Sequence, residues 1–97
     1  MADVVHELLA TEAAIDKLGA RGISVEAAGQ VPRNRHVTVR NPSEIGSPGK
    51  RRLLVGQTDS GLTLTLVIER TVDPSTWLIV TGWSSTEVER KLLRRSR

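Results

Sequence analysis

The segment from Leu62 to Arg70, which reads LTLTLVIER, constrains the fold more than any other part of the chain. Its side chains alternate strictly, with Leu62, Leu64, Leu66 and Ile68 on one side and Thr63, Thr65, Val67 and Glu69 on the other. Because successive side chains of a strand point to opposite faces, this alternation predicts a strand with one buried face. The turn formers at 58–61 join it to the apolar segment RRLLVGQ at 51–57, so the two predict a hairpin.

Two further segments are predicted to be strands. TWLIVTGW at 76–83 follows the turn TVDPS and completes an antiparallel meander, and HVTVR at 36–40 alternates ahead of a loop rich in turn formers. The parity of the first of these strands predicts that Trp77 and Trp83 share one sheet face with Ile79 and Thr81.

N-cap residues mark the expected helices. Thr11 is placed to cap a helix that runs to about Leu18, and Ser24 is placed to cap a short helix over 25–30. Ser84 and Glu87 have the spacing of a capping box, which predicts a C-terminal helix with an apolar stripe. Residues 3–10 fit either a short strand or the start of a helix.

Together these elements predict one α+β domain spanning residues 1–97. We expect an antiparallel sheet of three to four strands, with two N-terminal helices and a C-terminal helix packed on one face. The sequence has no Cys, which excludes disulfides and thiolate chemistry, and its two His are far apart, so no metal or other cofactor is expected. No apolar run approaches a membrane span and no leader is evident, so a cytoplasmic protein without membrane contact is expected.

The net charge is +3, and the basic residues are clustered. Residues 33–52 contain Glu44 as their one acid, against Arg33, Arg35, Arg40, Lys50, Arg51 and Arg52. A second basic cluster ends the chain. Guanidinium groups grip phosphate well, so clustering favours a nucleic acid or an acidic protein as partner. The alternative is a solvated face that keeps a small protein soluble.

The order of motifs resembles the BrnT-type toxins and their relatives. Residues 6–31 resemble the family's opening, with Arg21-Gly22-Ile23-Ser24-Val25-Glu26 matching the stretch that starts its second helix. RRLLVGQTDSGLTLTLVIE resembles the family's hairpin, and WLIVTGWSSTEVERKLL resembles its final strand and helix, with Thr86, Glu89 and Arg90 in the A-T-x-x-E-R pattern.

The resemblance implies a compact fold like that of RelE-type ribonucleases. It also implies the toxin half of a toxin–antitoxin pair, a metal-independent endoribonuclease that inhibits translation and is blocked by a small DNA-binding antitoxin. One position departs from the pattern, because Trp83 stands where the family has a basic residue. That departure favours a relative that has kept the fold and lost the nuclease activity.

RNA cleavage without a metal requires a base, an acid and a group that stabilises charge on the phosphate. Arg52 and Arg70, expected near one sheet edge, and then Arg90 are the candidates for charge stabilisation, and His36 is the candidate base. Candidate RNA contacts are Arg40, Arg51 and Trp83. The structural alternatives are arginines that lie over the core, a solvated histidine and a tryptophan that packs or anchors a partner.

Three hypotheses therefore stand. The chain is a toxin-type ribonuclease, a non-catalytic basic module that binds RNA, DNA or an acidic protein, or an assembly protein that uses its apolar patches. The predicted strand at 36–40 keeps the third hypothesis open, because an edge strand offers unpaired backbone groups to another chain.

Overall fold

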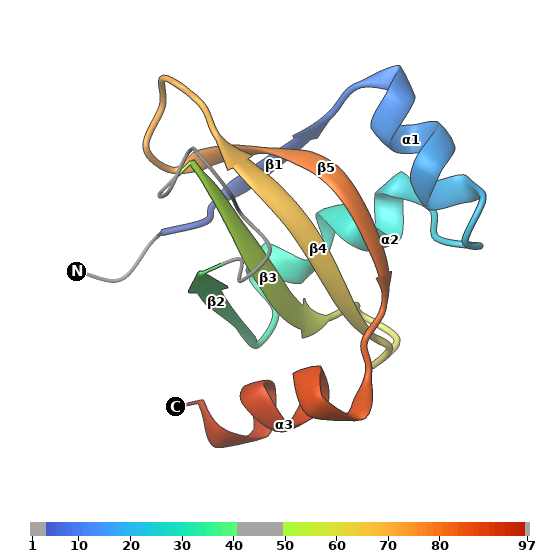
Figure 1. The fold of residues 1–97 in the computed structure, drawn as a ribbon, viewed down its shortest axis with the longest axis vertical. Coiled ribbons are helices and arrows are strands. Elements are labelled where there is room, and N and C mark those ends of the chain that lie inside the picture. Colours follow the sequence, from blue (N-terminus) through green and yellow to red (C-terminus); the bar gives the residue numbers. More distant parts are fainter. Residues whose placement is uncertain (1–3, 41–49, 97) are drawn as a thin grey trace.

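The computed structural model describes residues 4–40 and 50–96, which form a mixed sheet and three α-helices (Figure 1). The strands are β1 (Glu7–Ala10), β2 (His36–Arg40), β3 (Arg51–Gln57), β4 (Thr63–Arg70) and β5 (Thr76–Ser84). The helices are α1 (Glu12–Gly19), α2 (Val25–Gly29) and α3 (Glu87–Arg95), and a 3₁₀ turn covers Val31–Arg33. No helix in the described ranges has both the length and the apolar character needed to cross a bilayer.

The described strands are ordered β1-β5-β4-β3-β2. Strands β2 to β5 pair antiparallel, as expected, but β1 pairs parallel with β5, so the sheet has five strands and is mixed. The expectation of an all-antiparallel sheet of three to four strands is therefore wrong. The reason is that residues 7–10 form a strand, whose Leu8 and Ala10 pack against the core beside Trp77.

One face of the sheet, called here the core face, is covered by α1 and α2. The core face includes Leu54 and Leu66, which lie opposite each other on β3 and β4. Leu18 of α1 reaches this face next to Gly82, where a built Cβ atom would lie 3.1 Å from its Cδ2. Leu18, Leu54 and Leu66 are fully buried, so this layer holds the hydrophobic core.

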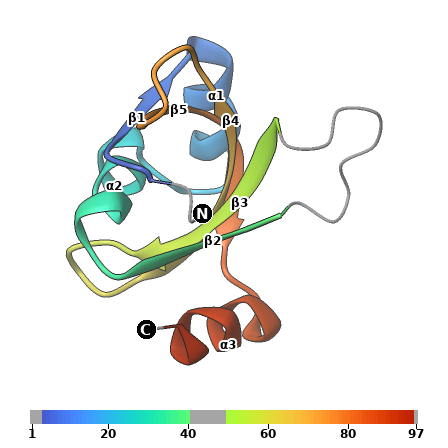
Figure 2. The ribbon, with the colours of Figure 1, turned by 90° about the vertical axis from the view of Figure 1, so that its left-hand side faces the viewer.

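Helix α3 lies on the opposite face, called here the α3 face. Figure 2 shows β2 and β3 between α2 and α3. The side chain of Glu89 on α3 contacts Thr65 and Trp83, which lie opposite each other on β4 and β5 and point away from the core face. The expectation that all helices pack on one face is therefore wrong, because α3 has its own contacts with the far side of the sheet.

The helix caps follow the sequence at two of three positions. The side chains of Thr11 and Ser24 accept hydrogen bonds from Ala14 N and Ala27 N, which confirms both predicted N-caps. At α3 the prediction is wrong, because Thr86 is the N-cap and Glu89 completes the capping box. The predicted cap, Ser84, still belongs to β5 and lies opposite Leu64.

A β-bulge interrupts the pairing of β4 and β5. Val67 lies opposite Thr81 and Ile68 lies opposite Ile79, so Val80 is the extra residue. The bulge reverses the parity of β5, which places Trp77 on the core face and Trp83 on the α3 face. The expectation that both indoles share a face is wrong, since parity counting assumes an unbroken strand.

Candidate nucleic-acid interface

Three of the arginines predicted to bind or act on RNA meet at one end of the core face. Arg40 and Arg52 are directly opposite each other on β2 and β3, and Arg52 is opposite Ile68 on β4. Arg70 lies two residues beyond Ile68 and so points to the same face. We call Arg40, Arg52 and Arg70 the arginine triad. Adjacent strands lie about 4.8 Å apart and a strand rises about 3.3 Å per residue, so the backbone positions of Arg40 and Arg70 are roughly 12 Å apart.

Neighbouring groups orient the members of the triad. The guanidinium of Arg70 stacks on Trp77, with its carbon 4.9 Å from the ring centroid, and the Trp77 Nε1 donates to the carbonyl of Val4 at 3.0 Å. The buried indole is thus fixed and provides a flat platform for Arg70. Arg52 donates from Nη1 to the carbonyl of Arg51 at 2.9 Å.

The like-charged pair of Arg40 and Arg52 is the unusual feature of this end of the sheet. Two cations directly opposite each other on paired strands form an unfavourable pair unless another group offsets their charge. A phosphate is suited to offset it, because a guanidinium can hold phosphate oxygens with two parallel hydrogen bonds. This placement is therefore suited to a polyanion.

Arg51 is at the same end of β3 but belongs to the other face. It lies opposite Glu69, and its Nε donates to the Glu69 carboxylate at 3.0 Å. The side chain therefore points away from the triad, because adjacent residues of a strand face opposite ways. Arg51 and the triad cannot hold the same phosphate.

His36 begins β2, at the end of the strand remote from Arg40. Four residues of strand separate the two Cα atoms by about 13 Å. Its Nδ1 lies 2.8 Å from the carbonyl oxygen of Asn34, which can only accept, so Nδ1 is the protonated nitrogen. A general base has to lie within about 3 Å of the proton that it removes, and His36 does not meet that condition at the triad.

Arg90 and Trp83 are both engaged with the C-terminal helix. Arg90 Nη1 donates to the carbonyl of Ser85 at 2.9 Å, and its Nε lies 3.5 Å from the carboxylate of Glu87. The Trp83 Nε1 donates to Glu89, and the indole is half-buried on the α3 face. Neither residue joins the arginine triad.

Two other arginines of the basic segment have structural partners. Arg33 forms an ion pair with Asp59, and hydrogen bonds from Arg33 and Asn34 hold the pKa of the Asp59 carboxyl below its ordinary value. Arg35 Nη2 donates to the carbonyls of Leu93 at 3.0 Å and Ser96 at 2.8 Å, at the C-terminal end of α3. Clustering in the sequence therefore overstates how many of these cations share one surface.

No chemical role was predicted for Lys17, Arg21 or Glu89, although Arg21 and Glu89 belong to motifs that resemble the toxin family. Lys17 and Arg21 line a cleft beside β5, and Arg21 stacks on Trp83 with its carbon 5.7 Å from the ring centroid. The spacing of Thr86 and Glu89 as a second capping box was the available signal for Glu89. Among the described residues, no group of three His, Asp or Glu side chains is arranged to hold a metal ion.

Comparison with known proteins adds no family assignment. The chain matches no protein-family model and no curated protein sequence. The functional argument therefore depends on the geometry of these side chains and on the resemblance of the motifs.

Proposed function

We propose that this chain is a basic RNA-binding module whose arginine triad grips the phosphate backbone. The observation that carries the proposal is the convergence of Arg40, Arg52 and Arg70 from three adjacent strands on one end of the core face. Contacts to phosphate carry no sequence information, so we expect single-stranded RNA to bind without strong sequence preference. The stack of Arg70 on Trp77 keeps one guanidinium oriented toward that surface.

The binding role is favoured over cleavage because the candidate base and the arginines are apart. His36 lies at the opposite end of β2, and Arg90 is on the other face of the sheet. A site that only binds phosphate requires no group to move a proton. The departure at Trp83 from the BrnT-type pattern agrees with a module that has kept the fold and lost the nuclease activity.

A toxin-type endoribonuclease, neutralised by a small DNA-binding antitoxin, is the second candidate. The observation that favours it is again the triad, because guanidinium groups also stabilise the charge that develops on a phosphate during transfer. Arg52 and Arg70 would then serve cleavage as well as binding. The two candidates differ in whether the bound RNA is cut.

The experiment measures fluorescence anisotropy of a labelled oligouridylate against protein concentration at several salt concentrations. Each of Arg40→Gln, Arg52→Gln and Arg70→Gln is expected to weaken binding and to reduce the slope of log affinity against log salt by about 0.7 to 1. Lys91→Gln is the matched control, because it removes one exposed cation from α3. Triad variants that bind like the control would contradict the proposal.

The same samples separate the two candidates when the RNA is run on a denaturing gel after incubation. Intact RNA is expected for the binding module. Cleavage by the wild type and not by Arg52→Gln would instead support the ribonuclease, and growth arrest on expression of the wild type alone would support the toxin role.

A further inference from the structure

Strand β2 is at one margin of the sheet. It is the last strand in the order, and β3 is the one strand in the described part of the chain that pairs with it. In Figure 1 no described helix or strand lies on the side of β2 away from β3, and none crosses in front of β2 in Figure 2. Helix α3 approaches β2 from the α3 face, where Arg35 holds its last turn. The outer side of β2 is thus an open edge among the described residues.

The outer side of β2 carries the backbone groups of alternate residues. Gln57 N donates to the carbonyl of Arg35 at 3.2 Å, so these two residues form a hydrogen-bonded pair that continues the register of β2 and β3. Such pairs alternate along an antiparallel ladder with pairs whose N–H and C=O groups point outward. On β2 the outward groups are therefore those of His36, Thr38 and Arg40.

The far side of β3 agrees with this assignment. Arg70 N donates to the carbonyl of Lys50 at 2.9 Å, which makes these two residues a hydrogen-bonded pair in line with β3 and β4. The even-numbered residues of β3 therefore bond to β4, and its odd-numbered residues bond to β2. Both ladders thus give the same outward residues on β2.

The side chains give the two faces of this edge different characters. On the α3 face, Val37 and Val39 are half-buried and lie opposite Val55 and Leu53, which are buried. The apolar surface of β3 therefore continues onto β2, where its valines are only partly covered. On the core face, Arg40 is exposed and belongs to the arginine triad.

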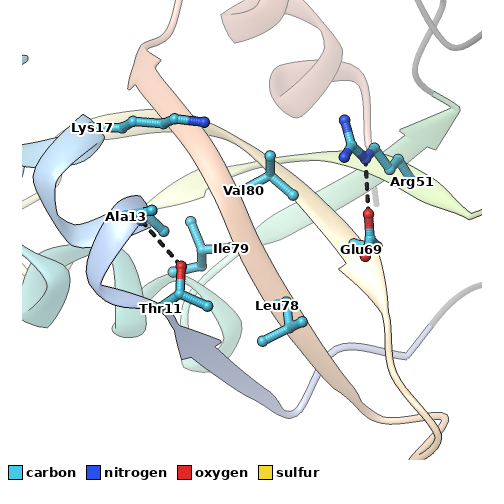
Figure 3. A pocket seen from close by; sticks show the side chains of 9 residues that line it. Thr11, Ala13, Lys17, Arg51, Glu69, Leu78, Ile79 and Val80 are labelled. Atoms are coloured by element: carbon cyan, nitrogen blue, oxygen red, sulfur yellow. Dashed lines mark hydrogen bonds and ion pairs between the residues drawn. The ribbon is translucent and has the colours of Figure 1, made fainter.

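The edge is also cationic. Residues 36–40 and 51–57, which form β2 and β3, include no aspartate or glutamate. Arg51 pairs with Glu69 of β4 on the α3 face, as Figure 3 shows. Arg40 lies opposite Arg52, which is an unfavourable pair unless its charge is offset. A carboxylate on a strand added outside β2 would lie beside Arg40 on the same face and offset part of that charge.

The charge pattern decides between two occupants of the edge. Two copies of β2 paired antiparallel around Thr38 would place Arg40 of one copy opposite His36 of the other and would supply no carboxylate. A partner strand with an acidic residue opposite Arg40 and apolar residues opposite Val37 and Val39 complements both faces. The cation at the edge therefore disfavours self-association, as charges do on other edge strands.

We propose that the outer side of β2 is a docking edge for an extended, acidic segment of a partner protein, which adds a strand beside β2. The outward N–H and C=O groups of Thr38 and Arg40 supply main-chain hydrogen bonds, as in other cases of strand addition. The Arg40 side chain selects an acidic residue, and Val37 and Val39 select apolar ones. The backbone of β2 takes no part in the proposed RNA binding, so the two proposals can fail independently.

The experiment follows amide hydrogen exchange by NMR in the full chain, with a blocked peptide containing Glu-Val-Thr-Val-Glu as the probe. This sequence reads the same in both directions, so it complements β2 whether it pairs parallel or antiparallel. At saturating peptide, exchange at the amides of Thr38 and Arg40 is expected to slow by at least about tenfold. The amides of Val37 and Val39 face β3 and should change much less.

A charge exchange tests the role of Arg40. Arg40→Glu is expected to weaken the affinity for the labelled probe, measured by fluorescence anisotropy, by about tenfold or more. The same variant should bind a peptide containing Lys-Val-Thr-Val-Lys more tightly than the wild type does. Lys91→Glu, on the exposed surface of α3, is the matched control and should leave both affinities unchanged. Equal affinity of Arg40→Glu and the control for the probe would overturn the proposal.

Two modified peptides keep the test independent of protein variants. Methylation of alternate backbone amides of the probe removes main-chain donors and is expected to abolish binding, and the lysine peptide is expected not to bind the wild type. The proposal is overturned if either modified peptide binds the wild type as well as the probe does, or if the probe leaves Thr38 and Arg40 unprotected. It is also overturned if oligouridylate or a higher concentration of the chain alone protects these amides and the acidic peptide does not.

Discussion

The indole Nε1 of Trp83 donates to both carboxylate oxygens of Glu89, at 3.0 and 3.2 Å, across the junction between β5 and α3. The same carboxylate accepts from the Thr65 hydroxyl at 3.0 Å and from the backbone N–H of Thr86 at 2.8 Å. One side chain therefore joins the sheet, the start of α3 and the second tryptophan. Trp83, which the sequence offers as a candidate RNA contact, helps to hold the C-terminal helix through its hydrogen bonds to Glu89.

Replacing Glu89 by Ala is expected to destabilise the protein by about 2 kcal/mol, because it removes a capping interaction and several charge-assisted hydrogen bonds. The free energy of unfolding in urea measures the loss. Glu87→Ala is the control, since Glu87 is exposed and water and salt screen its ion pairs with Arg90 and Arg94, so its loss should change the stability much less. Equal losses in the two variants would show that Glu89 has no special role.

Stability is expected to fall in acid partly through Glu89. Burial raises the pKa of this carboxyl, but the hydrogen bonds from Thr86, Trp83 and Thr65 outweigh that effect, so its pKa lies below the ordinary value. A carboxyl with a lowered folded pKa stabilises the protein fully above its unfolded pKa, and this contribution is lost as the pH falls through the folded pKa.

The comparison of wild type with Glu89→Gln tests this between about pH 5 and pH 3. The difference in unfolding free energy between the two proteins is expected to shrink as the pH falls. A constant difference would mean that the charge of Glu89 does not contribute.

Arg35 is expected to hold the end of α3 in place. Its guanidinium donates to the carbonyls of Leu93, Arg94 and Ser96, where the negative end of the helix dipole lies. Arg35→Ala should cost about 1 kcal/mol and speed amide exchange in the last turn of α3. Arg95→Ala, which removes a neighbouring exposed cation, should change neither quantity, and a matching effect there would argue against a specific cap.

Gly56 is expected to tolerate no side chain. A Cβ atom there would lie 2.6 Å from Val31 Cγ1, 2.7 Å from the His36 Cβ and 3.0 Å from the Arg35 carbonyl oxygen. Gly56→Ala should therefore destabilise by about 1–3 kcal/mol in thermal or urea unfolding.

Gly19→Ala is the matched control for Gly56→Ala. Nothing lies within 4 Å of a Cβ at Gly19, which is helical, so this change should stabilise by about 0.5–1 kcal/mol. Destabilisation by both substitutions would contradict the packing argument.

Local patterns were enough to predict most elements of this fold. The alternation of residues 36–40 and the apolar segment at 51–57 predicted β2 and β3 at their observed bounds, and Thr11 and Ser24 cap the helices that they were expected to cap. Local sequence cannot decide whether Ser84 or Thr86 is the N-cap of α3, because each has a glutamate three residues later. Contacts of Glu89 with Thr65 and Trp83, which lie on other elements, favour Thr86.

The site was less predictable because it depends on pairing between distant segments. The register that brings Arg40 opposite Arg52 follows from the pairing of β2 with β3, which the sequence alone does not fix. His36 and Arg40 are close in sequence, yet the extended backbone keeps them apart. The parallel pairing of β1 with β5 is likewise a contact between distant segments, which no local signal predicted.

The bulge at Val80 has an optical consequence. The sequence has two tryptophans and no tyrosine, so these two indoles produce nearly all of the protein's ultraviolet fluorescence. The inserted residue leaves Trp77 sealed in the core at 1% exposure and turns Trp83 toward α3, where it is partly accessible to water. A single extra residue has thus divided the emission of this protein into a component that reports on the interior and a component that reports on the attachment of its last helix.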